Sequence, residues 1–194
     1  MKNLSCGDGG MITTDEADQA DRARRLRWMG IDRSTHDRQG STYSWEYDCP
    51  EIGIKGHMND ITAAIGLVQL GKMPGMQRNR ASLAASYDSH LYVLPASVSL
   101  PCGERNSYQG WHLYVIRTDR RDELHEFLKQ RGIATGVHYK PLHLMGCYRD
   151  EHHPIHLPVA EREWQRILSL PMYPEMTAID QLKVIEAIRE FFDR

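Results

Sequence analysis

The stretch GWHLYVIRTDRRDELHEFLKQRG, residues 110–132, decides the fold class of the chain. Its first part is rich in apolar and β-branched side chains at extended spacing, which predicts a strand. The part that follows places Leu124, Phe127 and Leu128 on one face of a helix, and Gly132 marks the end of that helix. A strand that leads directly into an amphipathic helix is typical of domains that mix the two kinds of element.

Elements of the same two kinds surround this stretch. Strands are predicted in SVSLP and IATGVHY, a short extended run in SLPMYP, and helices in PVAEREWQRIL and AIDQLKVIEAIREFF. Their alternation predicts a small α/β or α+β domain at the C-terminal end of the chain.

A long helical segment precedes this domain. Residues 57–72 and 77–91 both have helical spacing, with Asn59 or Asp60 as the cap, and the Pro-Gly pair at 74–75 predicts a break between them. We expect this segment to bridge two bodies. The expected divisions are 1–72 for the first body, 73–94 for the bridging helix and 95–194 for the C-terminal domain.

The N-terminal part combines a shorter helix with a long irregular connection. A helix is predicted over residues 15–29, with Thr14 as its N-cap and Gly30 as its stop. Residues 31–57 contain too many turn residues for a helix and one possible strand, at 42–47. Aromatic and polar side chains alternate in that strand, so we expect one aromatic face to be buried.

The composition excludes several classes of protein. The chain has 194 residues, a net charge of −2 and a pI near 6.5, so it carries no basic footprint for nucleic acid. Hydrophobic residues at 41% and charged residues at 26% are typical of a soluble globular protein. No stretch has the roughly 20 apolar residues of a membrane span. Its four scattered cysteines form no CxxC pair, which favours reduced thiols in a cytoplasmic protein.

Lys2 is the first candidate for chemistry, because it shortly precedes the glycine cluster GDGG. A lysine amine can form a Schiff base with a carbonyl cofactor, of which pyridoxal phosphate is the commonest. A glycine turn would let the backbone approach such a bulky cofactor closely. A surface lysine beside a turn gives the same pattern, so both interpretations stay open. The glycine spacing matches neither a dinucleotide fingerprint nor a P-loop.

Histidines are the second candidate, in the segment GVHYKPLHLMGCYRDEHHPIH. They are His138, His143, His152, His153 and His156. Imidazole is a common zinc ligand, so a metal site is one hypothesis. No pair has the HExxH spacing, and the prolines of the segment predict a loop. The other hypothesis is therefore a substrate-facing loop in which some histidines are solvated.

Four segments occur together and in order. They are KNLSCGDGGMIT (2–13), GIKGHMNDITAAIGLVQL (53–70), GVHYKPLHL (136–144) and LSLPMYP (168–174). Together they resemble the C-terminal half of a DegT/DnrJ/StrS-type sugar aminotransferase, over essentially the whole chain. Enzymes of this family use pyridoxal phosphate to place an amino group on a nucleotide-linked keto-sugar. The resemblance implies an α/β fold, with a remnant of the large cofactor-binding domain of a fold-type I aminotransferase and its small C-terminal domain.

The resemblance also implies roles for single residues. Lys2 matches the lysine that binds the cofactor as an imine, and Asp8 stands where the family has glutamate. Segment 53–70 matches one that reaches the phosphate of the neighbouring subunit's cofactor. The cofactor-binding residues implied there are Lys55, His57 and Asn59. The substrate-binding residues implied in the histidine segment are His138, Tyr139, His143 and Arg149.

In the chemistry that the resemblance implies, an amino donor such as glutamate displaces Lys2 from the cofactor. The freed amine then moves a proton as a general acid–base group, and the nitrogen passes to the keto-sugar in ping-pong fashion. Retention of the lysine argues against a subgroup that performs dehydration and has histidine there. A homodimer is expected because each site borrows groups from its partner, and neither nucleic acid nor a membrane is an expected partner.

In the family this lysine lies in mid-chain, whereas here it is residue 2. We therefore expect a truncated half of an aminotransferase that binds pyridoxal phosphate weakly, if at all. Elements of the large domain that lack their neighbours are expected to expose apolar surface. Two alternatives stay open: a non-catalytic remnant that acts as a dimerisation module, and a zinc protein built on the histidine segment.

Overall fold

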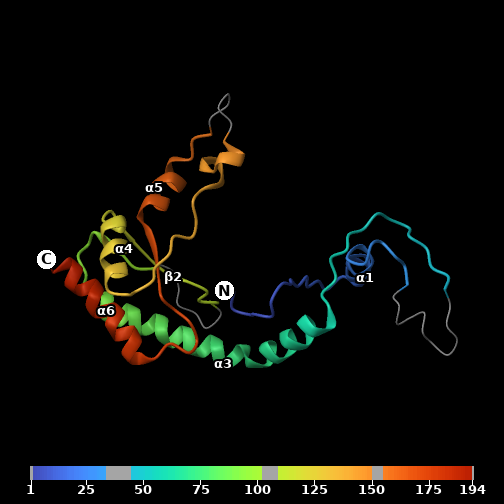
Figure 1. Cartoon of the computed structure of the whole chain (residues 1–194), viewed down its shortest axis with the longest axis horizontal. Helices are drawn as coiled ribbons and strands as arrows, with labels where there is room; N and C mark the ends of the chain where they lie inside the picture. The colour runs from blue at the N-terminus through green and yellow to red at the C-terminus, as the bar shows by residue number, and fades with distance from the viewer. Residues whose placement is uncertain (1, 34–44, 102–108, 150–154, 194) are drawn as a thin grey trace. The chain divides into compact units, whose positions relative to one another are not determined.

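The chain divides into two compact units (Figure 1). We call residues 3–71 the first unit, and residues 72–194 together with Lys2 the second unit. The computed structural model describes residues 2–33, 45–101, 109–149 and 155–193. In these ranges, no helix combines the length and the apolar character that crossing a membrane requires.

The first unit begins with an extended segment that leads into helix α1 (Ala17–Leu26). This helix is shorter than the predicted one over 15–29, because its N-cap is Glu16 and not Thr14. The Thr14 hydroxyl accepts a hydrogen bond from the Glu16 N–H at 3.1 Å, and so acts before the helix begins. No side chain of α1 is buried.

Two glycines allow the chain to cross the end of α1. Gly30 has a φ of 79°, in the left-handed region, and a Cβ there would collide with the Glu51 carbonyl. A Cβ on Gly53 would likewise collide with the backbone of Leu26, whose carbonyl accepts the Ile54 N–H at 2.7 Å. This close approach holds the start of the GIKGHMND segment against the helix end.

The predicted strand at 42–47 is not found in its described part, residues 45–47. Trp45 is 76% exposed and Tyr47 51% exposed, so the expectation of a buried aromatic face is wrong for these two side chains. Tyr43 lies outside the described residues. A half-buried strand needs a neighbouring strand and a core to cover one face, and the described part of the first unit provides neither.

Helix α3 (Asp60–Leu91) is continuous, although a break was predicted at residues 74–75. Pro74 is exposed within it, so the helix loses one backbone hydrogen bond there while the turns on both sides persist. The predicted cap is confirmed, because the Thr62 N–H donates to Asn59 Oδ1 at 2.9 Å. Its buried side chains all lie toward its C-terminal end: Arg80, Leu83, Ala84, Tyr87, Asp88 and Leu91.

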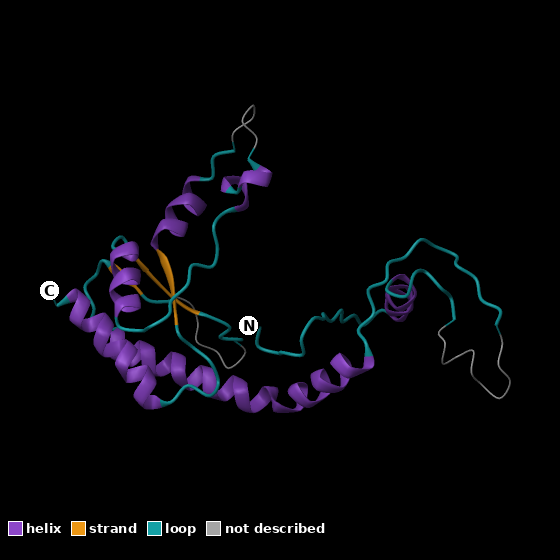
Figure 2. Ribbon diagram, in the orientation of Figure 1, coloured by secondary structure: helices purple, strands orange, loops and turns teal. Residues whose placement is uncertain are grey.

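The second unit contains a three-stranded antiparallel sheet in the order β1-β2-β3 (Figure 2). Its strands are β1 (Val98–Ser99), β2 (Tyr114–Thr118) and β3 (Ile167–Leu170). Val98 pairs with Thr118, and Tyr114 pairs with Leu170. The strand predicted at IATGVHY is reduced to one bridge, in which Gly136 and Ser169 exchange backbone hydrogen bonds of 3.1 and 2.7 Å.

Helices complete this unit around a common core. They are α4 (Arg121–Gln130), η1 (Leu142–Leu144), η2 (Gly146–Tyr148), α5 (Pro158–Arg166) and α6 (Ala178–Phe192). The Thr177 hydroxyl caps α6 by accepting the Asp180 N–H at 3.1 Å. Side chains with no exposed surface include Ala84, Tyr87, Tyr114, Ile116, Leu124, Leu128, Leu168 and Ile188. The predicted α4 and α6 are thus confirmed, with their apolar stripes facing this core.

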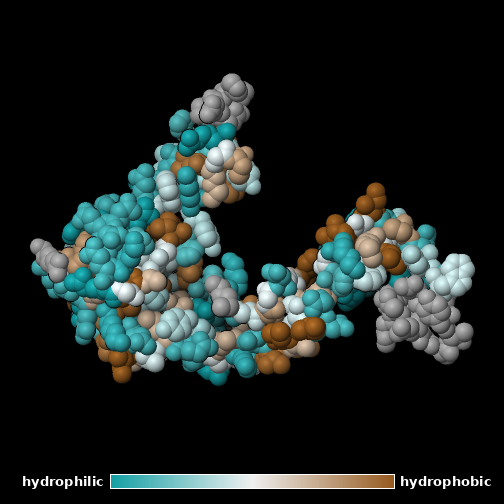
Figure 3. Space-filling model, viewed as in Figure 1, coloured by the Kyte–Doolittle hydropathy of each residue, from teal (hydrophilic) through white to brown (hydrophobic). Residues whose placement is uncertain are grey.

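The first unit, in contrast, exposes large hydrophobic side chains (Figure 3). Among them are Met11, Ile12, Ile52, Ile54, Ile61 and Leu67, which are between 70% and 97% exposed. All of the buried hydrophobic residues that the described ranges contain belong to the second unit. The expectation of exposed apolar surface is therefore confirmed, and the described part of the chain has its hydrophobic core in the second unit.

Candidate active site

Lys2 is exposed and groups with the second unit. Its ammonium is one of the charges that act on His112, which lies two residues before the start of β2. Burial is the largest cause that lowers the pKa of His112, followed by the charges of Lys2 and Arg80. The sequence analysis did not identify His112 as a candidate site residue, because His112 belongs to no motif and lies in a stretch that predicts only a strand.

Arg80 holds the segment that carries His112. The Arg80 side chain is buried, and its Nη1 donates to the carbonyls of Trp111 (3.3 Å), His112 (3.2 Å) and Met172 (3.4 Å). Burial lowers the pKa of Arg80, and the charge of Glu175 opposes that shift. One guanidinium therefore joins α3 to two other segments and fixes the backbone beside the candidate histidine.

His138 is held by β3. Its Nδ1 lies 2.8 Å from the hydroxyl of Ser169, which is 4% exposed. Gly136 lies beneath the ring, because a Cβ there would approach His138 Cε1 to 2.8 Å. Tyr139 is 64% exposed and meets the His138 ring edge-on, with 4.8 Å between the centroids. The imidazole is thus oriented from one side, and the tyrosine beside it faces solvent.

His143 is held by a different element. It lies on η1, its side chain is 6% exposed, and its Nε2 is 2.9 Å from Glu161 Oε1 on α5. Arg149 follows η2 and is exposed. Neither Glu161 nor Ser169 was predicted as a site residue, although Ser169 lies within the LSLPMYP motif.

Two of the predicted cofactor-binding residues of the first unit lie together against Trp28. Lys55 Nζ is 4.4 Å from the centroid of the Trp28 ring, and the His57 ring meets Trp28 edge-on with 4.3 Å between centroids. His57 Nδ1 is buried and has no hydrogen-bond partner among the described residues. Asn59, the third predicted residue, has a different contact: its side-chain oxygen caps α3.

The GDGG turn lies beside the same stack. A Cβ on Gly9 would collide with the Met58 side chain, so the turn packs directly on the GIKGHMND segment. A pocket of about 900 Å³ opens between them within the first unit. Its polar lining includes Asp8, Thr13, Thr14, Arg24, Arg27 and His57.

The zinc hypothesis finds no further support here. Within the described ranges, no three or more His, Cys, Asp or Glu side chains gather closely enough to hold a metal ion. His138 and His143 instead contact Ser169 and Glu161, while His152 and His153 lie outside the described residues.

Known proteins resemble the chain over almost its whole length. A sequence model of the DegT/DnrJ/EryC1/StrS aminotransferase family matches residues 1–189. The aminotransferase TlmJ from Streptoalloteichus hindustanus is 31% identical, with a TM-score of 0.83 over 98% of this chain and 49% of its own. DesV from S. venezuelae, solved with a ketimine intermediate, is 33% identical, with a TM-score of 0.79 over 93% of this chain and 46% of its own. The putative sugar aminotransferase Spr1654 from Streptococcus pneumoniae, solved in a PMP form, is 25% identical, with a TM-score of 0.79 and coverages of 93% and 46%.

The fold defines a class: a mixed α/β chain that matches about half of a fold-type I sugar aminotransferase structure. The chain belongs to the DegT/DnrJ/EryC1/StrS aminotransferase family, which depends on pyridoxal phosphate. The predicted family and fold class are confirmed. The chain spans about half the length of the solved relatives that it matches.

Proposed function

We propose that this chain supplies the cofactor lysine and the sugar-binding loop of an aminotransferase that acts on a nucleotide-linked keto-sugar, with glutamate as amino donor. The observation that carries the proposal is Lys2, which stands in the KNLSCGDGGMIT motif inside the region that the family model matches. The sugar aminotransferases among the similar structures support the substrate class.

The chemistry of the residues present fits pyridoxal phosphate. Lys2 offers an exposed primary amine for an aldehyde, and an amine is the group that such cofactors require. For a phosphate, Lys55 offers an ammonium group and His57 an imidazole ring. The Nδ1 atom of that ring is buried and lacks a hydrogen-bond partner among the described residues. Lys2 would hold the cofactor of its own chain, whereas Lys55 and His57 would hold the phosphate of a second copy's cofactor.

When bound, pyridoxal phosphate supplies an electron sink for the carbon from which a proton is removed. Lys2 Nζ would bind the cofactor and, once freed, take the proton from the α-carbon of the amino donor as a general base. His112 lies in the surroundings of this amine, because the charge of Lys2 is among the causes that lower the pKa of His112. His138, Tyr139, His143 and Arg149 would bind and orient the keto-sugar and its nucleotide.

Partners and location are also part of the proposal. We propose a homodimer in which Lys55 and His57 serve the site of the second copy. Cys6, Cys49 and Cys147 are free thiols in the structure, which supports a reducing, cytoplasmic compartment.

A non-catalytic module is the second candidate function. The observation that favours it is the division of the core, because buried hydrophobic residues of the described ranges occur only in the second unit. That unit could persist as a folded domain whether or not the first unit completes a cofactor site.

Chemical trapping separates the two candidates. The chain is incubated with pyridoxal phosphate, reduced with borohydride and mapped by mass spectrometry. We expect the reduced adduct on Lys2, its loss in Lys2→Ala and its retention in Lys129→Ala, a matched exposed lysine on α4. Labelling spread evenly over surface lysines, and unchanged in Lys2→Ala, would instead support the non-catalytic module.

A further inference from the structure

Glu161 uses one carboxylate oxygen for two contacts. Its Oε1 accepts the Leu157 N–H at 2.8 Å and lies 2.9 Å from His143 Nε2. The Leu157 hydrogen bond is the largest cause that lowers the pKa of Glu161, and the His143 hydrogen bond is the next. Glu161 is therefore ionised at neutral pH, and an ionised carboxylate only accepts hydrogen bonds.

This charge state determines which nitrogen of His143 carries a proton. Because the carboxylate cannot donate, Nε2 must be the protonated nitrogen in the 2.9 Å contact. In the neutral ring, Nδ1 then has a free lone pair. Ser169 places no such restriction on His138, because a hydroxyl group both donates and accepts.

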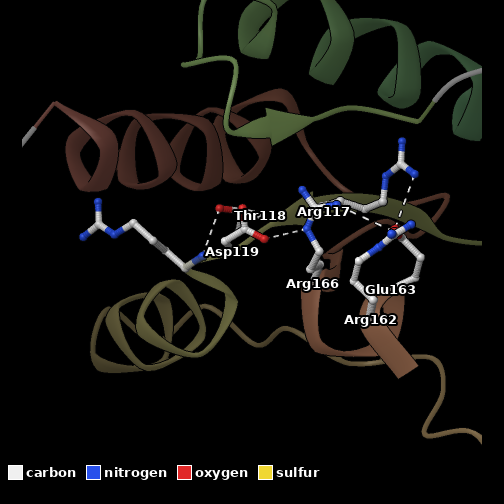
Figure 4. Close-up of polar contacts among 7 residues, drawn as sticks. Arg117, Thr118, Asp119, Arg162, Glu163 and Arg166 are labelled. Atoms are coloured by element: carbon white, nitrogen blue, oxygen red, sulfur yellow. Dashed lines mark hydrogen bonds and ion pairs between the residues drawn. The ribbon is translucent and has the colours of Figure 1, made fainter. Parts of the chain in front are cut away.

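The helix that carries Glu161 is fixed to the sheet. Glu163 on α5 contacts Arg117 of β2 at 3.5 Å, and Arg166 contacts Asp119 at 2.7 Å (Figure 4). Arg121 adds a hydrogen bond of 3.1 Å to the carbonyl of Trp164. Glu161 therefore meets His143 from a helix that several contacts hold in place, and the His143 side chain is only 6% exposed.

We propose that Glu161 is a positioning residue that keeps the His143 proton on Nε2 and presents Nδ1 as a hydrogen-bond acceptor. The ligand chemistry follows from this tautomer. An acceptor nitrogen binds a group that has a proton to donate, such as a sugar hydroxyl, whereas phosphate oxygens have none to offer. If the proposed function holds, on which this step rests, His143 recognises a hydroxyl group of the sugar, and other residues bind the phosphates of the nucleotide.

The direct test is nuclear magnetic resonance of the chain with ¹⁵N-labelled histidine, at about pH 8, above the ordinary histidine pKa of about 6.5. We expect a slowly exchanging, downfield proton on Nε2 of one histidine, assigned to His143 by its absence in His143→Asn. Nδ1 of the same ring should have the ¹⁵N shift of an unprotonated acceptor. A proton on Nδ1, or protons on both nitrogens at this pH, would overturn the proposal.

Three variants show whether the carboxylate itself is responsible. Glu161→Gln keeps an acceptor for Leu157 but adds a donor, so the protected Nε2 proton should weaken or disappear. Ser169→Ala should alter the signals of His138 alone, and Glu163→Gln should leave the His143 proton in place because the Arg166 contact with Asp119 remains. Loss of the His143 proton in Glu163→Gln as well would contradict the proposal, since the general placement of α5 would then control the ring.

Turnover separates this proposal from the function on which it rests. In an active sample, Glu161→Gln should slow the sugar half-reaction by about 10- to 100-fold, the scale of one lost hydrogen bond to a charged group. The half-reaction with the amino donor should keep its rate. If no turnover is found, the proposed function fails while the ¹⁵N spectrum still decides the tautomer.

Discussion

At the scale of single residues, the second unit buries a carboxylate in its core. Asp88 of α3 is 6% exposed, and the Tyr114 hydroxyl donates to its Oδ1 at 2.6 Å. Tyr87, the residue just before Asp88, donates to the Pro171 carbonyl at 2.7 Å, and burial raises its pKa so that it stays a neutral donor. These hydroxyl groups satisfy polar atoms that would otherwise be desolvated without compensation.

Tyr114→Phe removes the hydroxyl group but keeps the ring. We expect the free energy of unfolding to fall by about 1.5–3 kcal/mol, the usual contribution of a hydrogen bond to a charged group. Urea denaturation, followed by far-UV circular dichroism, measures this loss at an unchanged m-value. Tyr92→Phe is the matched control because Tyr92 is 74% exposed, and an equal loss there would contradict the assignment.

Sequence reasoning does not reach contacts of this kind. It identifies the strand that contains Tyr114, but Asp88 lies 26 positions earlier on a helix. Glu161 and Ser169 escape it for the same reason, since their roles depend on pairing across 18 and 31 positions. Lys2, His138 and His143 could be predicted as site residues because motif spacing, unlike tertiary contact, is visible in the sequence itself.

At the scale of elements, α3 shows how a helix tolerates residues that usually interrupt it. Pro74 lacks the N–H that would bond to the carbonyl of Leu70, and Gly71 and Gly75 flank it. A Cβ at Gly71 would meet no atom within 4 Å. The local preference for a break is therefore overridden by the helical turns on either side.

Pro74→Ala should stabilise α3. Alanine restores the missing N–H and removes the clash of the proline ring, and Pro74 is exposed, so no packing is lost. We expect the free energy of helix unfolding to rise by about 1–3 kcal/mol. Amide hydrogen exchange of residues 70–80 measures the effect, and faster exchange in the variant would show that the proline stabilises this helix.

Other elements follow their sequence patterns closely or fail for identifiable reasons. Helices α4 and α6 appear where apolar side chains recur at helical spacing. The helix predicted to continue past Arg166 becomes β3 there, because Ile167 and Leu168 pair with β2. The segment IATGVHY, expected to be a strand, forms only one bridge, between Gly136 and Ser169. An apolar sequence pattern alone does not provide a neighbouring strand that pairs along its length.

At the scale of the whole molecule, stability is distributed unevenly. The family and the α/β class were predictable because four motifs keep their order over the chain, and the comparisons confirm both. The position of the hydrophobic core was not predictable, because it depends on which apolar helix and strand faces pack against another element. Met11 and Ile61 carry as much apolar character as Leu124 and Ile188, yet the first pair is exposed and the second pair is buried.

The whole molecule should lose stability in two steps as the pH falls. Burial, with the charges of Lys2 and Arg80, lowers the pKa of His112 below 6.5 in the folded chain. Between that folded value and 6.5 the unfolded chain binds more protons, so stability falls as the pH drops below about 6.5. Arg162 similarly lowers the pKa of Glu163 below 4.5, so a second loss begins as the pH drops below about 4.5.

Urea midpoints measured between about pH 2.5 and pH 8 test both steps, and each step has its own variant. His112→Asn should flatten the upper step, because asparagine takes up no proton in either state. Glu163→Gln should reduce the lower step and leave the upper one intact, since its carboxylate contacts Arg117, Arg162 and Arg166. A midpoint that rises as the pH falls from 6.5 would contradict the assignment of His112 as a group kept neutral by the fold. Such a rise would mean that folding raises the pKa of a histidine, as a neighbouring carboxylate does.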